Sequence, residues 1–166
     1  MDQILALKIA KYNKREPQYP SYVDANDFGL CLRAAHDLEP GTIVATADFE
    51  KTDKIFIANS PREEDRYIAV MDVTPDGKPV NGKIRGKWAF CNHSCDPNCT
   101  ISDTWSIITN RTVKQGDELT TAYDAYVDNC PWQQSWSFEC KCNAAGCKKF
   151  IDRYRYDIVY PVKKRM

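Results

Sequence analysis

The sequence has no excess of charge of either sign. Lysine and arginine together number 23, aspartate and glutamate also number 23, and the formal net charge is +0 at pH 7. Proteins that attract nucleic acid or an anionic membrane through a general field carry a clear positive excess. We therefore expect no direct nucleic-acid binding and no membrane binding, and we interpret the local basic clusters KIRGK (83–87) and VKKRM (162–166) as solvated surface.

The sequence also has no long apolar run and no secretory signal. Its start, MDQILALKIAKYNKR, lacks a basic region ahead of the apolar residues, and Lys8 interrupts them. A membrane span needs roughly 20 consecutive apolar residues, and a signal peptide needs an uninterrupted apolar centre. We expect a reducing intracellular compartment, which is the nucleus or the cytosol, or a host cell if the chain is exported by a route without a cleaved signal.

Helical periodicity is scarce as well. Within the first 19 residues ILALKIA has a helical pattern, which REPQYP interrupts. The remainder alternates stretches rich in β-branched and aromatic residues with turn signals such as EPG, NSP, TPDG, NG and KQG. At 166 residues the chain has the size of one domain. The pattern predicts a mostly β domain with short helices, and strands within residues 41–49, 54–60, 66–73, 105–113 and 117–126.

Two segments of the chain resemble each other. LEPGTIVATA (38–47) and VKQGDELTTA (113–122) both run from an apolar residue through two turn residues and a glycine into a strand that ends in Thr-Ala. The match is compatible with two related β units and equally with coincidence.

Cysteine, by contrast, is abundant. Of the eight cysteines Cys31 stands alone, and the other seven lie between Cys91 and Cys147. In a reducing compartment clustered thiols bind metal more often than they pair as disulfides. The C-x-C-x4-C spacing of residues 140–147 supplies three thiolates to a tetrahedral zinc site, which needs a fourth ligand. The spacing leaves that ligand open among Cys130, His36, Cys91, His93, Cys95 and Cys99.

Two other interpretations of these cysteines are weaker. An iron–sulfur cluster would also take four cysteines, but the compact spacing suits a single ion better. Unligated surface thiols crowded within eight residues would be open to oxidation. We therefore predict one structural Zn²⁺, whose binding is coupled to the folding of the last quarter of the chain.

Four separated motifs occur in one order along the chain. They are DFGLCLRAAHDLEPGTIV (27–44), NHSCDPN (92–98), GDELTTAY (116–123) and FECKCNAAGC (138–147). In this order and roughly at these distances they resemble the SET domain with its post-SET zinc segment, over about residues 22–150. The resemblance implies a SET fold of several small curved β-sheets with a pseudoknot threading, which brings NHSCDPN beside ELTTAY, and a C-terminal zinc-bound post-SET segment. It divides the chain into an N-terminal lead segment (1–21), the SET domain (22–126) and the post-SET segment with a tail (127–166).

The SET family consists mostly of protein lysine methyltransferases that use S-adenosylmethionine. The resemblance implies methyl transfer to the ε-amine of a lysine in a protein or peptide, a histone tail being one candidate, by in-line displacement in a narrow channel. Two alternatives stay open. In place of an active methyltransferase, the chain is a SET-fold binding module with weak or no catalysis, or it is a zinc-stabilised protein-interaction domain.

The resemblance also assigns residues to the cofactor. By position, Asn92 and His93 would hold the adenosine portion, and the backbone of Gly29, Leu30 and Cys31 would contact the methionine end, where a missing Cβ lets the chain come close. A role of His93 as general base or metal ligand is the weaker interpretation.

Catalysis and metal binding are assigned in the same way. Tyr123 would be the catalytic tyrosine, whose hydroxyl positions the amine, and the small Thr121 lies at a position that affects the product state in the family. Aromatic residues available to wall the lysine channel are Tyr67, Tyr126, Trp132, Trp136 and Phe138. The fourth zinc ligand implied by the family pattern is Cys95, which completes the set Cys95, Cys140, Cys142 and Cys147.

Three positions depart from the family pattern. Cys31 replaces the second glycine of G-x-G, so a side chain stands where the family has none. Ala89 stands where many members have arginine, and Ala122 where many have aspartate or asparagine. The first two departures motivate the alternative of a binding module without catalysis.

Overall fold

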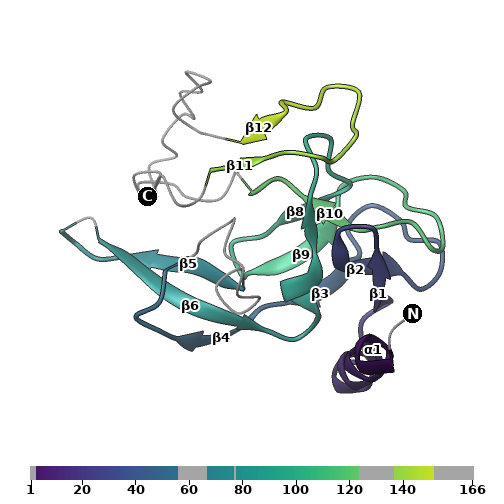
Figure 1. The fold of residues 1–166 in the computed structure, drawn as a ribbon, viewed down its shortest axis with the longest axis horizontal. Coiled ribbons are helices and arrows are strands. Elements are labelled where there is room, and N and C mark those ends of the chain that lie inside the picture. Colours follow the sequence, from purple (N-terminus) through teal and green to yellow (C-terminus); the bar gives the residue numbers. More distant parts are fainter. Residues whose placement is uncertain (1–2, 56–66, 77, 124–136, 152–166) are drawn as a thin grey trace.

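The computed structural model describes residues 3–55, 67–76, 78–123 and 137–151. Over these residues the chain is mostly β with one α-helix and one short 3-10 helix, as predicted (Figure 1). The expected strand at 54–60 lies mostly outside the described residues. The elements are α1 (Gln3–Arg15), β1 (Ser21–Asn26), β2 (Gly29–Ala34), β3 (Ile43–Thr46), β4 (Asp48–Lys51), β5 (Ile68–Val73), β6 (Pro79–Arg85), η2 (Lys87–Phe90), β7 (Asn92–His93), β8 (Cys99–Ile101), β9 (Ser106–Thr109), β10 (Thr120–Thr121), β11 (Phe138–Glu139) and β12 (Phe150–Ile151).

The strands form several small sheets, in agreement with the expected architecture. Two sheets have three strands, in the orders β3-β9-β8 and β4-β6-β5, and the pairs β1-β2, β7-β10 and β11-β12 complete the set among the described residues. The pairings are antiparallel except for β7 with β10, which run parallel. Parallel neighbours need a long connection, so this pair joins segments far apart in the sequence.

Helix α1 is packed against the β domain. It ends at Arg15 because Pro17 disfavours helical backbone in the residue before it. The Asn13 side chain accepts the N–H of Val23 at 2.6 Å and donates to its carbonyl at 2.9 Å, and the Tyr12 ring meets Phe90 at 4.5 Å. The expected lead segment is therefore integrated into the fold. Among the described residues no helix has the length and apolar content that a membrane crossing requires.

The stretch after α1 is fixed by a buried lysine. Lys87 is only 2% exposed, and its ammonium donates to the carbonyls of Glu16 at 2.7 Å and Ser21 at 2.6 Å. The interpretation of residues 83–87 as solvated surface is therefore wrong for Lys87, because these two carbonyls replace water around its charge. Gly86 adopts a φ of 75°, which favours glycine, and a Cβ there would displace the Glu16 carboxylate.

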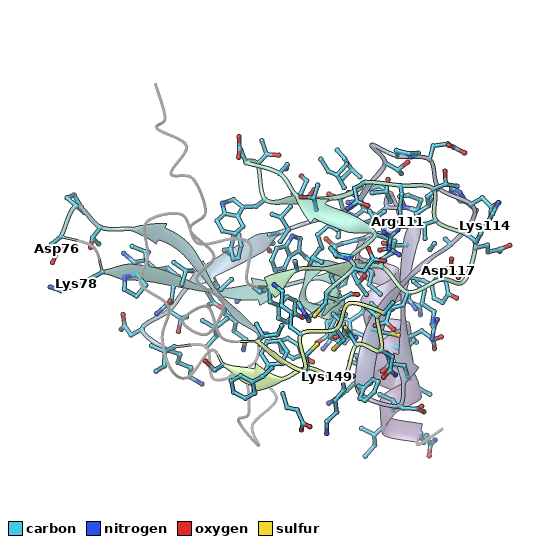
Figure 2. The ribbon with its side chains drawn as sticks, turned by 90° about the horizontal axis from the view of Figure 1, so that it is seen from above. Asp76, Lys78, Arg111, Lys114, Asp117 and Lys149 are labelled. Atoms are coloured by element: carbon cyan, nitrogen blue, oxygen red, sulfur yellow. The ribbon has the colours of Figure 1, made fainter. Side chains whose placement is uncertain are left out.

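The β5–β6 hairpin extends away from the rest of the molecule (Figure 1). Its turn is closed by Thr74, whose N–H donates to the Lys78 carbonyl at 2.8 Å, and Asp76 and Lys78 lie at its tip (Figure 2). The prediction of a turn at Asn81–Gly82 is wrong. Both residues lie inside β6, the central strand of its sheet, where Gly82 pairs with Lys51 on one side and Ala69 on the other. The chain reverses between Thr74 and Lys78, where the earlier turn signal lies, and Asn81 and Gly82 are paired within the sheet.

The strand expected at 41–49 is divided. It forms β3 and β4, which belong to different sheets, and Ala47 between them donates its N–H to the Trp105 carbonyl at 2.9 Å. The two similar segments of the sequence form equivalent turns. Gly41 and Gly116 both have positive φ, at 88° and 83°, and the segments pair through two hydrogen bonds between Leu38 and Val113 at 2.8 and 3.0 Å.

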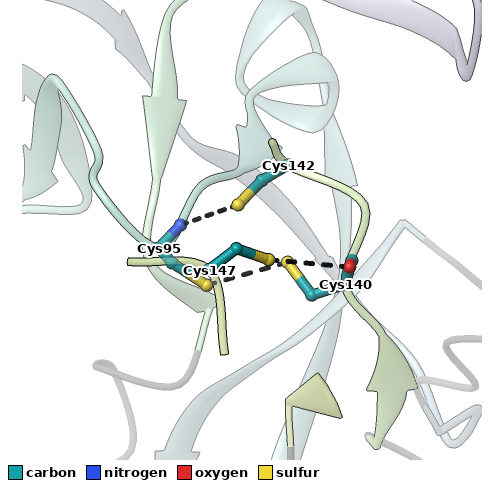
Figure 3. Close-up of side chains that lie close together, drawn as sticks. All are labelled: Cys95, Cys140, Cys142 and Cys147. Carbon is teal, nitrogen blue, oxygen red and sulfur yellow. Dashed lines mark hydrogen bonds between the residues drawn. The ribbon is translucent and has the colours of Figure 1, made fainter. Parts of the chain in front are cut away.

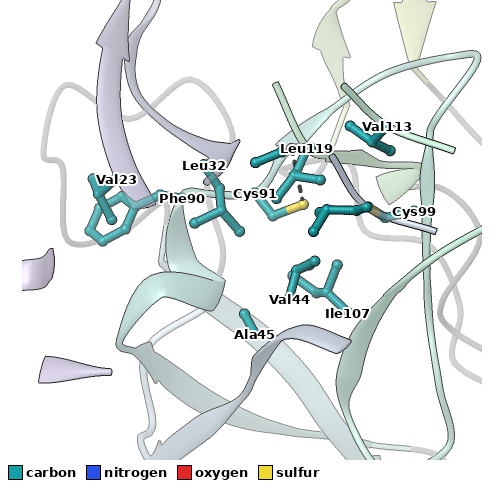
Figure 4. Close-up of a cluster of buried hydrophobic side chains, with 12 residues drawn as sticks. Val23, Leu32, Val44, Ala45, Phe90, Cys91, Cys99, Ile107, Val113 and Leu119 are labelled. Carbon is teal, nitrogen blue, oxygen red and sulfur yellow. Dashed lines mark hydrogen bonds between the residues drawn. The ribbon is translucent and has the colours of Figure 1, made fainter. Parts of the chain in front are cut away.

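One main core lies between the β1–β2 hairpin, β3, η2 and β9 (Figure 4). Leu119 and Leu32 are fully buried there, and truncating such a side chain to alanine costs about 2–5 kcal/mol. Cys91 and Cys99 are members of this core, which agrees with their interpretation as small buried hydrophobes. Because Cys91 is directly followed by β7, the core fixes the start of the NHSCDPN motif.

Candidate active site and metal centre

The two central motifs lie side by side. Asn92 and His93 of β7 pair in parallel with Thr120 and Thr121 of β10, and the Ser94 N–H donates to the Thr121 carbonyl at 2.9 Å. This is the juxtaposition that the expected threading would produce.

The turn of NHSCDPN is hydrogen-bonded to the chain at β10. The Asn98 side chain donates to the Glu118 carbonyl at 2.8 Å and accepts the Thr120 N–H at 2.9 Å. The amide nitrogen donates and the amide oxygen accepts, so this side chain makes the two hydrogen bonds that the backbone of a neighbouring strand would otherwise make. Asn98 thus has the shaping role that a turn residue needs.

Four cysteine sulfurs meet where this turn contacts the C-terminal segment (Figure 3). The Sγ atoms of Cys95, Cys140, Cys142 and Cys147 all lie within 4.8 Å of one another. The Cys95 and Cys140 sulfurs are 3.7 Å apart. Four thiolates around Zn²⁺ with bonds of about 2.3 Å would be separated by roughly 3.8 Å. The donor set and its dimensions therefore fit one zinc ion.

The other candidate ligands that the structure describes lie outside the cluster. Cys91 and Cys99 are buried in the main core, and His36 is exposed. His93 approaches Cys95 with its Nε2 atom 3.4 Å from the sulfur, as a hydrogen-bond partner of a ligand. Cys130 lies outside the described residues. The structure thus brings together the four cysteines named from the family pattern.

The electrostatics of the cluster favour one thiolate before any ion binds. Burial acts to raise the pKa of Cys142, but the N–H groups of Cys95 and Ala144 outweigh it and, with the neighbouring thiols, lower that pKa to about 6. Burial raises the pKa of Cys95 and Cys140. Cys95 and Cys140 must therefore lose their protons when a cation binds.

Tyr123 lies next to the candidate metal centre, and its hydroxyl is oriented by a hydrogen bond. The hydroxyl donates to the Cys91 carbonyl at 2.8 Å, and the Tyr123 N–H donates to His93 Nδ1 at 3.0 Å. Because Nδ1 accepts, the hydrogen-bond network assigns the ring proton to Nε2, which faces Cys95. His93 therefore links a candidate zinc ligand to the backbone of the candidate catalytic residue.

Phe138 of β11 covers this pair of side chains. Its ring lies 5.6 Å from His93 and 6.1 Å from Tyr123, both in edge-to-face arrangements. It is the one expected channel residue that the described structure places here. Tyr67 packs on Phe90 in the main core at 5.5 Å, and Tyr126, Trp132 and Trp136 lie outside the described residues.

The candidate cofactor residues meet at the end of the β1–β2 hairpin. Gly29 has a φ of 125°, which favours glycine, and a Cβ built on it would meet nothing within 4 Å. Asn92 donates its side-chain amide to the Leu30 carbonyl at 3.3 Å and to Glu118 at 2.8 Å. Open space lies beside Gly29, and the polar side chain of Asn92 is bonded to the neighbouring backbone.

The Cys31 side chain does not occupy this open space. It is 0% exposed, and burial, followed by the charge of Glu118, raises its pKa to about 11. The departure from G-x-G therefore places a neutral thiol inside the protein.

Sequence reasoning missed Glu118, whose carboxylate accepts hydrogen bonds from the side-chain amides of Asn92 and Asn26. The available signal was a carboxylate inside the quoted motif GDELTTAY, directly before the fully buried Leu119. A charged residue directly next to a fully buried one is partly withdrawn from water and usually has a specific partner.

Comparison with known protein families identifies the family of this chain. The chain belongs to the SET family, because the SET domain profile matches residues 29–124. Among curated proteins, Histone-lysine N-methyltransferase trr of Drosophila melanogaster is 25% identical over 163 residues, which are 90% of this chain and 6% of that protein. Histone-lysine N-methyltransferase, H3 lysine-36 specific, of Gibberella zeae is 27% identical over 157 residues, which are 85% of this chain and 16% of that protein.

Further matches cover shorter stretches. Histone-lysine N-methyltransferase SUV39H2 of Xenopus tropicalis is 28% identical over 107 residues, which are 52% of this chain and 26% of that protein. One solved structure, from Plasmodium falciparum, overlaps with a TM-score of 0.46 at 17% identity, over 64% of this chain and 94% of that chain. This chain spans only a small part of the length of the curated relatives it matches.

Proposed function

We propose that the chain transfers a methyl group from S-adenosylmethionine to the ε-amine of a lysine in a protein substrate. The observation that carries the proposal is the oriented hydroxyl of Tyr123, which stands beside the NHSCDPN motif in a chain of the SET family. The names of the curated relatives support the same reaction class.

The reaction needs a neutral, correctly oriented amine. A free lysine has a pKa of about 10.4, and desolvation together with a nearby positive charge lowers it, so no strong base is required. The hydrogen of the Tyr123 hydroxyl is held by the Cys91 carbonyl. Its oxygen lone pairs can then accept an N–H of the amine, which turns the nitrogen lone pair toward the donor. Such positioning supplies a large part of the rate in reactions of this type.

S-adenosylmethionine, when bound, supplies an electrophilic methyl group on a positively charged sulfur. Gly29, Leu30 and Cys31 would contact it through their backbone, and Asn92 through its side chain. His93 uses both ring nitrogens within the protein, so its contact with the cofactor would come from its backbone.

The four cysteines would hold one structural Zn²⁺. An ion there would fix the C-terminal segment against the turn at Cys95 and hold Phe138 over Tyr123 and His93. Water would be kept away from the amine, which strengthens the desolvation described above.

The substrate is a protein or peptide that carries a lysine, and a histone tail is the first candidate because the curated relatives are named for histone lysines. The balanced charge of the chain gives no support to direct nucleic-acid binding. The described cysteines are free thiols, which supports a reducing compartment, the nucleus or the cytosol, or a host cell after export.

A peptide array with isotopically labelled S-adenosylmethionine tests the proposal. The wild-type protein should label lysine-containing peptides, and Tyr123→Phe should lower the rate by about a hundredfold or more while calorimetry finds unchanged cofactor binding. Full activity of the variant would reject the role of Tyr123. Cofactor binding without any labelled lysine would favour a binding module of SET fold, and no cofactor binding would favour a zinc-stabilised interaction domain.

A further inference from the structure

Glu118 connects the β1–β2 hairpin to β7. Its carboxylate accepts from the side-chain amide of Asn92 at 2.8 Å on one oxygen and from that of Asn26 at 2.9 Å on the other. All three side chains are partly buried. Asn26 ends β1 and Asn92 begins β7, two points far apart in the chain.

The carboxylate determines which way both amides face. An ionised carboxylate only accepts hydrogen bonds, so each asparagine must present its nitrogen. The second N–H of Asn92 is directed to the Leu30 carbonyl at 3.3 Å, which also only accepts. The Asn26 oxygen accepts the Phe28 N–H at 2.9 Å. Turning either amide over would set oxygen against oxygen.

This arrangement leaves one atom of Asn92 for a ligand. Both of its amide hydrogens are used, and among the described residues none donates to its Oδ1 atom. A ligand bound here must therefore bring an N–H or O–H donor. S-adenosylmethionine has such donors on its adenine, its ribose and its α-amino group.

We propose that Glu118 is a positioning residue that holds Asn92 with its oxygen toward the cofactor. This inference rests on the proposed function. The local charge supports it, because Arg33 is paired with Asp24 at 3.0 Å, which leaves the Glu118 carboxylate as a net negative charge. A ligand with a positively charged sulfur is attracted to such a site.

Calorimetric titration of S-adenosylmethionine into four purified proteins tests the assignment. Glu118→Met removes both acceptors and keeps the chain length, and Glu118→Gln keeps one acceptor. Asp117→Asn is the matched control, because it removes the same charge one residue away from an exposed carboxylate that serves only its own turn. We expect a Kd raised about tenfold or more in Glu118→Met, a smaller rise in Glu118→Gln, and no change in Asp117→Asn.

The binding stoichiometry separates positioning from a structural role. A positioning role leaves one site per chain and raises Kd, whereas partial misfolding lowers the number of sites and leaves Kd unchanged. In steady-state assays the positioning role raises KM for the cofactor and leaves KM for the peptide as it is.

Each outcome has a meaning. An unchanged Kd in Glu118→Met, a drop in stoichiometry alone, or an equal rise in Asp117→Asn overturns the role of Glu118 and spares the proposed function. A wild-type protein that does not bind the cofactor overturns both. If Glu118→Met does not fold, Asn26→Ala replaces it: loss of one of the two bonds that hold the carboxylate should raise Kd severalfold, and a wild-type Kd there overturns the role.

Discussion

Replacing His93 by phenylalanine separates the hydrogen bonds of this side chain from its packing. The His93 ring has Nε2 at 3.4 Å from the Cys95 sulfur and accepts the Tyr123 N–H on Nδ1 at 3.0 Å. It also packs edge-to-face on Phe138 at 5.6 Å and on Tyr123 at 5.5 Å. A phenylalanine ring of similar size keeps the packing and loses both hydrogen bonds.

The expected magnitudes follow from these contacts. A group that donates to a metal ligand contributes about ten- to a hundredfold to metal affinity, so His93→Phe should weaken zinc binding by that factor. Loss of the bond to the Tyr123 N–H should lower the stability of the metal-free protein by about 1 kcal/mol. The methyl-transfer rate should fall further than stability does, because Tyr123 loses the partner that fixes its backbone.

Competition with a chromogenic chelator measures the zinc affinity, and urea unfolding of the metal-free protein measures the stability. The sequence contains two histidines, and the other, His36, is exposed, so His36→Phe is a matched control that should change neither quantity. An unchanged zinc affinity in His93→Phe would refute the link between His93 and the metal centre. Equal losses in both variants would show that the effect is not specific to the site.

Three further outcomes are expected. Cys95→Ser should reduce the zinc content from one ion per chain, as measured by plasma mass spectrometry, whereas Cys99→Ser should keep it because that thiol lies in the main core; equal content in both variants would move the fourth ligand elsewhere. Zinc affinity should rise with pH from about 6 upward. Cys142 is already a thiolate above that pH, but Cys140, whose pKa is raised by burial, must still release a proton when zinc binds. A flat pH profile in chelator competition would contradict this. Chelation should abolish methyl transfer before circular dichroism reports loss of the strands, because the cysteine cluster packs with a small separate apolar group rather than with the main core. Simultaneous loss of activity and of the circular dichroism signal would contradict this separation of the cysteine cluster from the main core.

The motif match predicted what local spacing left open. From spacing alone the fourth ligand had six candidates, and only the family pattern singled out Cys95, which lies within 4.8 Å of the other three sulfurs. Composition and turn signals predicted a mostly β domain, and the resemblance to the SET family implied that its sheets are several and small. The paired segment Asn81–Gly82 was misread, because a turn dipeptide and an interior strand position look alike until the neighbouring strands are known.

Residues that act across the fold were beyond local patterns. Lys87 belongs to a basic cluster in the sequence, and its burial depends on two carbonyls of the segment that follows α1. Glu118 meets Asn26 over a separation of 92 residues. Neither partner can be read from a window of neighbouring residues, because the register between distant segments decides both.

A metal ion at the four cysteines would also have an entropic consequence for the chain. Cys95 and Cys140 are separated by 45 positions, so an ion that joins them closes a loop of that length. By the chain-entropy relation used for disulfides, holding the unfolded chain in such a loop would cost about 4 kcal/mol, so an ion would bind the folded segment in preference to the unfolded chain. A zinc cross-link of this kind is reversible in a reducing compartment, where a disulfide would be lost. The half-life of the folded C-terminal segment would then follow the supply of free zinc.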